Sequence, residues 1–216
     1  MNGCCLFVVV TTTKLPWEHA SKSDEKVTLA IRLAALLHDV DDHKYFPTTS
    51  TSPESYQNAR AIMASLGAAM NTPETQQLVT TTIEEIKEFV IIMIDLVSCS
   101  THGNSVPEYI VQGSLFHYLI PRWSDRLEAV GVIGVVRCYQ YNKAKKQPLY
   151  GPLSPRATSV EEVWRLATPD MLEDYISRGG TSNDMISHYY DKLLHIARPP
   201  KQLVQNRYFT RLFFFF

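Results

Sequence analysis

Cysteine is scarce in this chain of 216 residues, and its four copies form no recognisable set. Cys4 and Cys5 are neighbours, whereas Cys99 and Cys138 stand alone inside apolar segments, and the chain has no CxxC pair. A zinc–thiolate site is therefore not expected, and nothing requires an oxidising compartment. We expect Cys99 and Cys138 to be buried thiols.

An excess of one charge is also lacking. The formal net charge is -1 and charged residues make up 20% of the chain, which is ordinary for a globular protein. A nucleic-acid-binding protein would need a basic excess or a clear basic stripe, so this balance argues against that class. The basic run Lys143–Lys146 is short, and we expect it to be a solvated loop.

No apolar run is long enough to cross a membrane. The run FVIIMIDLV, Phe89–Val97, is short and contains Asp95, so it predicts a buried helix. The N-terminal apolar stretch has neither a positive flank nor a cleavage site, so we expect no signal peptide and an intracellular, cytoplasmic protein. The terminal run Phe213–Phe216 suggests an interaction surface. P-loop, GxGxxG, GxSxG and HExxH motifs are absent.

Helix signals dominate what is present. The starts Ser52-Pro53-Glu54, Thr72-Pro73-Glu74 and Thr168-Pro169-Asp170 each combine a hydroxyl N-cap, a proline and an acid, and Ser159 with Glu162 forms a capping box. The only strand candidate is LFVVVTTT, residues 6–13. We therefore expect an all-α domain with helices at 24–41, 53–67, 73–99, 123–142, 159–167, 169–178 and 182–198.

The densest group of chemically active side chains is LLHDVDDHKYF, Leu36–Phe46, at the end of an apolar helix. His38 and Asp39 would lie about 100° apart around that helix, and both could reach one ion if other helices supplied further ligands. A mixed imidazole and carboxylate site suits Mn, Fe, Mg or Zn. The alternative is a core histidine at 38 followed by solvated acids at Asp39, Asp41 and Asp42.

A second group, Ser124-Asp125-Arg126, stands where another strongly apolar helix is expected to begin. Asp125 is a candidate metal ligand, and Arg126 is a candidate for orienting it or for binding phosphate. The alternative is an N-terminal carboxylate that the helix dipole stabilises.

The segments LAALLHDVDDHKYF, SDRLEAVGVIGVVRC and ISHYYDKLLHI together resemble the HD-domain metal-dependent phosphohydrolase superfamily. The likeness runs from about Trp17 to Pro199. It implies an all-α, HD-domain-like helical bundle over residues 17–200, with an irregular N-terminal segment at 1–16 and a C-terminal extension at 201–216.

The resemblance also implies a ligand set for a divalent metal ion. His38 and Asp39 match the family's adjacent pair, Asp125 matches its distal aspartate, and His19 matches its first histidine. The chain departs from the family after His19, because it passes almost at once into the helix that carries His38. Most of an intervening helix is missing, so His19 would have to reach the ion from a loop.

Three further residues are candidates for substrate binding. Lys44 lies just past the pair and could neutralise a substrate phosphate, or it could be a cation at a helix C-terminus. His43 is its neighbour, and His102 follows the helix expected at 73–99, with Gly103 as its C-cap. The resemblance adds weight to His102, because extra histidines from this region bind substrate or metal in several family members.

The resemblance implies a phosphohydrolase that acts on a small phosphoester or nucleotide. Asp39 or a neighbouring acid would take up the proton of the attacking water, and Lys44 and Arg126 would offset charge on the phosphate. The rival hypothesis is a catalytically impaired protein of the same fold that binds a nucleotide or a protein partner. The shortened region after His19 and the aromatic C-terminus support that rival.

Overall fold

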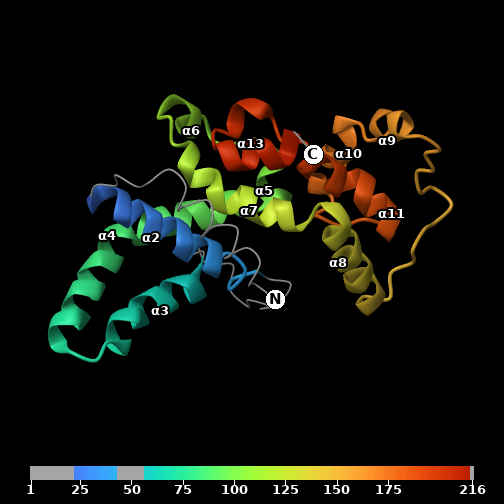
Figure 1. The fold of residues 1–216 in the computed structure, drawn as a ribbon. Helices are drawn as coiled ribbons and strands as arrows, with labels where there is room; N and C mark the ends of the chain where they lie inside the picture. The colour runs from blue at the N-terminus through green and yellow to red at the C-terminus, as the bar shows by residue number, and fades with distance from the viewer. Residues whose placement is uncertain (1–21, 43–55, 215–216) are drawn as a thin grey trace. The chain divides into compact units, whose positions relative to one another are not determined.

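A computed structural model describes residues 22–42 and 56–214. Over this part of the chain the structure contains helices and turns and no strand, which confirms the expected all-α fold (Figure 1). The chain divides into two compact units. The first comprises residues 1–97 and 118–124, and the second comprises residues 98–117 and 125–216. Between residues 22–42 and 56–214, no helix is both long and apolar enough to span a membrane.

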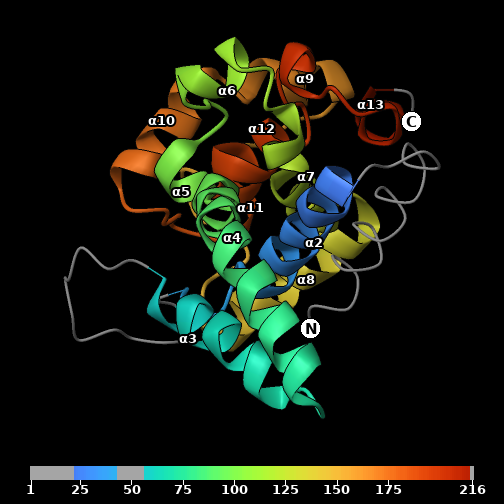
Figure 2. The same cartoon turned by 90° about the vertical axis from the view of Figure 1, so that its left-hand side faces the viewer.

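The first unit is built on the long helix α4, Pro73–Val97. Helix α2, Lys22–Leu37, packs along it, and α3, Gln57–Leu66, packs against it through the η1 turn, Gly67–Ala69 (Figure 2). Small side chains allow the close approach of α2: its buried face consists of Ala30, Ile31, Ala34, Ala35 and Leu37. At the surface, Arg60 makes a bidentate ion pair with Glu88 of α4, with N–O distances of 2.7 and 3.1 Å.

Two elements contribute to both units. The 3-10 helix η2 spans Phe116–Leu119, and α7 spans Ile120–Glu128. Within the first unit, the fully buried Arg122 donates its Nε–H to the carbonyl of Leu96 at the end of α4. This bond satisfies one of the carbonyls that a helix C-terminus leaves without an intrahelical donor.

The second unit is a set of shorter helices. In chain order they are α5 (Cys99–His102), α6 (Glu108–Gln112), α8 (Gly131–Ala144), α9 (Val160–Leu166), α10 (Pro169–Ser177), α11 (Met185–His188), the π-helix η3 (Tyr189–Leu193), α12 (Leu194–Ile196), η4 (Lys201–Leu203) and α13 (Arg207–Phe214). Residues 201–214, expected as an extension, thus contain helical structure and lie in this unit.

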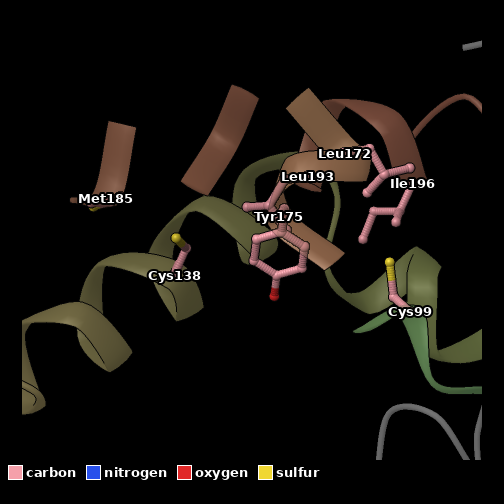
Figure 3. Close-up of a cluster of buried hydrophobic side chains, with 7 residues drawn as sticks. All are labelled: Cys99, Cys138, Leu172, Tyr175, Met185, Leu193 and Ile196. Carbon is pink, nitrogen blue, oxygen red and sulfur yellow. The ribbon is translucent and has the colours of Figure 1, made fainter. Parts of the chain in front are cut away.

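The core of the second unit is a cluster of Cys99, Cys138, Leu172, Tyr175, Met185, Leu193 and Ile196 (Figure 3). Cys99 and Cys138 are free and buried, as expected. Tyr175 also packs edge-to-face against His188, with ring centroids 5.6 Å apart. Buried polar bonds fix the surrounding loops. Asp191, for example, accepts hydrogen bonds from Ser182 and Arg178 at 2.7 and 3.2 Å.

The long segment between α8 and α9 is fastened to the start of α11. Asp184, the N-cap of α11, accepts hydrogen bonds from the amide and hydroxyl of Ser187 at 2.7 and 2.8 Å, and from the hydroxyl of Ser154 at 2.8 Å. Burial acts to raise the pKa of Asp184, but these hydrogen bonds outweigh it and hold the pKa below its ordinary value. The Ser154 hydroxyl in turn accepts the amide of Gly151.

Several expected helix starts are confirmed. Helix α4 begins at Pro73 with the Thr72 hydroxyl accepting the amide of Thr75, and α10 begins at Pro169 after Thr168. The Ser159 hydroxyl caps α9 by accepting the amide of Glu162. The carboxylate of Glu162 bonds Thr158 rather than Ser159. The start expected at Ser52, and the strand candidate at residues 6–13, lie outside the described residues.

Three expected helices are interrupted. The one expected at 73–99 ends at Val97, and α5 follows with Gly103 as its C-cap at a φ of 54°. The one expected at 123–142 breaks between α7 and α8, where Val130 is extended and Gly131 has a φ of 71°. A left-handed residue costs glycine little, so Gly131 permits this break. The helix expected at 182–198 contains the π-helical turn η3.

Candidate functional site

The His38–Asp39 pair lies in the first unit, directly after α2. We expected it on consecutive helical positions, but the helix ends at Leu37 and residues 38–41 form a turn. The amides of Val40 and Asp42 donate to the carbonyls of Leu37 and Asp39, each at 3.1 Å. The pair therefore lies in the turn directly after the C-terminus of the helix and not on the helix itself.

The imidazole of His38 is oriented by the backbone. Its Nδ1 lies 2.9 Å from the carbonyl oxygen of Ala35, so Nδ1 carries the hydrogen and donates it. Its Nε2 then faces the Oδ1 atom of Asp39 at 3.3 Å. The His38 side chain is 7% exposed and the Asp39 side chain 41% exposed. A bond from one ring nitrogen to a backbone carbonyl fixes the ring orientation, as it also does in many metal-binding histidines.

Asp41 anchors the turn that holds this pair. Its Oδ1 and Oδ2 accept the amides of Asn58 and Ala59 at 2.8 and 2.9 Å, at the start of α3. The Asn58 side chain returns a bond of 2.9 Å to the carbonyl of Val40. The alternative of solvated acids does not describe Asp41, because its carboxylate satisfies amides that the first turn of a helix leaves open.

Tyr56 and Asp95 were not among the expected site residues. Tyr56 precedes α3 with a left-handed φ of 68°, and its hydroxyl donates to Oδ1 of Asp95 at 2.8 Å. Burial, the bond to Asp95 and the charges of Asp95 and Asp41 raise the pKa of Tyr56 above its ordinary value. The available signal was the acid at position 95 inside an otherwise apolar helix, which we used only to argue against a membrane span.

Asp125 and Arg126 lie in α7 and belong to the second unit. They were expected at the start of a helix, but α7 begins five residues earlier, at Ile120, where Pro121 suits the first helical turn because an amide there has no intrahelical acceptor. The dipole argument for an N-terminal carboxylate at Asp125 therefore fails. Asp125 is partly buried. Its role as a metal ligand stays a prediction.

Arg126 is 1% exposed and donates to the loop after α5. Its Nη1 lies 2.6 Å from Oδ1 of Asn104, and its Nη2 donates to the carbonyl of Gly103. Burial lowers the pKa of this guanidinium, and the nearby Asp125 carboxylate acts in the opposite direction. These bonds make Arg126 an anchor of the loop, and a contact with phosphate would require one of them to break.

The remaining candidates are distributed as follows. His102 is the last residue of α5 and is partly buried in the second unit. His19, His43 and Lys44 lie outside the described residues. Among residues 22–42 and 56–214, no three His, Cys, Asp or Glu side chains gather so that they could hold a metal ion. The described part of the site thus brings two donors together, the imidazole of His38 and the carboxylate of Asp39.

Comparison with known proteins gives one informative match. No family model matches the chain, and no solved structure matches it. The protein named Uncharacterized protein L803, from Acanthamoeba polyphaga mimivirus, is 38% identical over 194 residues, which cover 90% of this chain and 73% of that protein. At this identity and coverage, the chain belongs to the same family as this mimivirus protein.

Proposed function

We propose that this protein is an HD-type, metal-dependent phosphohydrolase that acts on a phosphomonoester or nucleotide. The single observation that carries the proposal is the geometry of His38, whose Nδ1 is held by the carbonyl of Ala35 while Nε2 is presented beside Asp39. An imidazole nitrogen and a carboxylate oxygen 3.3 Å apart are close enough to bind one ion together.

The residues present fit two positions of a mixed imidazole and carboxylate site for Mn, Mg, Fe or Zn. The resemblance implies Asp125 and His19 as the further ligands. A divalent ion in such a site supplies charge stabilisation for a phosphoryl oxygen and acidifies a bound water. The protein's part is to hold His38 in one tautomer beside Asp39 and to fix their turn through Asp41.

Proton transfer is assigned to Asp39 as well, and the substrate's charge to other residues. The exposed side of Asp39 is accessible to a proton released from an attacking water. Lys44 is proposed to contact the substrate phosphate, and His43 and His102 to contribute further substrate contacts. Arg126 acts in this proposal by positioning the loop at Gly103, next to His102.

The test is hydrolysis of p-nitrophenyl phosphate and of a panel of nucleoside monophosphates, with Mn²⁺ or Mg²⁺ added. The Asp39→Asn variant keeps the size of the side chain and removes its charge, and we expect a loss of rate of at least about 100-fold. Asp174→Asn is the matched control, because Asp174 is exposed on α10 in the other unit. Full activity of Asp39→Asn would disprove the assignment. Nucleotide binding by a wild type that hydrolyses nothing would favour the non-catalytic alternative.

A further inference from the structure

Helix α8 is attached to the second unit by a narrow strip of its surface. Only Gly134, Cys138 and Asn142 are buried on it, four residues apart, so they lie on one side of the helix. A side chain at Gly134 would collide with the backbone of Ala129, so glycine is needed for this close approach. The side-chain amide of Asn142 donates to the carbonyl of Cys138 at 2.8 Å, on this buried side of the helix.

The opposite side of α8 is apolar and exposed. Val132, Val136 and Tyr139 follow a spacing of four and three residues, which places them on one stripe that faces away from the buried side of the helix. They are 81%, 48% and 47% exposed, and the adjacent Ile133 is 65% exposed. Isolated exposed apolar residues are common, but a continuous stripe of them marks an interaction site.

The segment that follows α8 also carries exposed apolar side chains. Leu153 is 89% exposed, the highest value among the large apolar residues of the described chain. It lies on the connection that is tied down by the Ser154–Asp184 bond, so its backbone is held while its side chain is presented to solvent. Tyr150, 62% exposed, lies on the same connection.

Positive charge accompanies the apolar side chains. Between residues 129 and 160 the sequence has no Asp or Glu, and five basic residues: Arg137, Lys143, Lys145, Lys146 and Arg156. All five are exposed, and Arg137 forms an ion pair with Glu128 at 2.9 Å, so the other four supply the net positive charge. Lys143 continues the stripe at the C-terminal end of α8, where a cation is also favoured by the helix dipole. Lys145 and Arg156 lie over the rings of Tyr141 and Tyr150, with 5.9 and 5.6 Å to the centroids.

We propose that this surface, formed by α8 and the segment to Arg156 and called here the α8 surface, docks onto an anionic lipid bilayer. Aliphatic side chains enter the interface, tyrosines lie at headgroup depth and lysines pair with lipid phosphates. This is a peripheral mode of binding that needs no spanning helix. It goes beyond the proposed hydrolase activity and does not depend on it.

Two other occupants fit less well. A second copy of the chain, paired symmetrically, would bring Lys143, Lys145, Lys146 and Arg156 of each copy against those of the other, with no acid in the segment to offset them. A single-stranded nucleic acid would use the lysines and tyrosines. It would leave Val132, Val136 and Leu153 without a function, because aliphatic side chains neither stack on bases nor bond them.

The test is co-sedimentation of the full chain with vesicles of phosphatidylcholine alone or with about 30% phosphatidylserine. We expect binding only to the anionic vesicles, weakened when salt rises from about 0.1 to 0.5 M because screening shortens the range of the attraction. The triple variant Lys143→Glu, Lys145→Glu, Lys146→Glu should bind at least about 100-fold more weakly, since each lysine contributes about fivefold. Val132→Ser with Val136→Ser should abolish the binding that survives high salt.

The matched control reverses three exposed cations elsewhere in the second unit, Arg165→Glu, Lys201→Glu and Arg207→Glu, and should bind normally. Circular dichroism melts verify that each variant is folded, and hydrolysis of a soluble phosphoester should be the same in the lysine variant as in wild type. Equal binding to neutral vesicles, or no binding to anionic ones, overturns the proposal. So does retention of a single-stranded oligonucleotide through the same lysines without vesicle binding, which would assign the surface to nucleic acid.

Discussion

The hydroxyl of Tyr56 donates a hydrogen bond of 2.8 Å to the carboxylate of Asp95, and it thereby joins the residue before α3 to the last turn of α4. Tyr56 adopts a left-handed backbone conformation, which is unfavourable for a bulky side chain and has to be offset by its contacts. The bond also brings the phenol close to Asp41, which anchors the turn carrying His38 and Asp39.

Replacing Tyr56 with phenylalanine should therefore destabilise the protein. Hydrogen bonds to charged groups contribute about 1.5–3 kcal/mol, and we expect a loss of about 2 kcal/mol in the free energy of unfolding. Urea denaturation measures this loss. Tyr139→Phe, at an exposed position on α8, serves as the control and should change stability by less than about 0.5 kcal/mol. An unchanged midpoint for Tyr56→Phe would show that the bond is not formed in solution.

Asp41→Ala removes the cap of α3 and loosens the turn at His38. The loss of two accepted amide bonds should cost about 1–2 kcal/mol, since N-cap substitutions fall in this range. If the turn positions the metal pair, Mn²⁺ affinity should fall as well, although Asp41 is not proposed as a ligand. Asp174→Ala is the control for both measurements. Weaker stability with unaltered Mn²⁺ affinity would separate Asp41 from the site.

Asp184→Ala should release the segment between α8 and α9. The buried carboxylate accepts three hydrogen bonds, and we expect a cost of about 2–4 kcal/mol in stability. Trypsin cleavage after Lys145, Lys146 or Arg156 should then be faster than in wild type under native conditions. Ser154→Ala breaks only one of these bonds and should give a smaller increase. Equal cleavage rates in all three proteins would contradict the proposed anchoring.

Two partly buried histidines should make the protein sensitive to acid. Burial lowers the pKa of both His117 and His195 below the ordinary value of 6.5. The unfolded chain then binds protons more readily than the folded one, so the stabilisation is present above pH 6.5 and is lost as the pH falls below it. Free energies of unfolding at pH 8, 6.5 and 5 measure this slope. His195→Gln and His117→Gln should each reduce it, and an unchanged slope in both variants would refute the assignment.

Local signals in the sequence were sufficient to predict the helical class and several helix starts. Thr72 and Ser159 act on amides within three residues, so their capping is decided by neighbours in the chain. The break after α7 was not predictable in this way, because VGVIGVV is apolar throughout and Gly131 is tolerated in helices as well as turns. The exposure of α8 was likewise missed, since an apolar helix is ordinarily taken as buried.

The candidate site could be predicted only in part. His38 and Asp39 are adjacent in the chain, and their proximity follows from that alone. The contacts of Asp41 with Asn58 and of Tyr56 with Asp95 join separate elements, and the spacing of residues in sequence does not encode them. Arg126 showed the same limit, because its partners at Gly103 and Asn104 lie in a loop more than twenty residues earlier.

The measurement that tests the central claim most directly is Mn²⁺ binding by equilibrium dialysis, followed by metal analysis, on wild type and on the variants His38→Ala, Asp39→Ala and Asp174→Ala. We expect wild type and Asp174→Ala to bind the ion with the same affinity, and His38→Ala and Asp39→Ala to bind it at least about 100-fold more weakly. A wild type that binds no Mn²⁺, or an Asp39→Ala variant that binds it as tightly as wild type, would contradict the account.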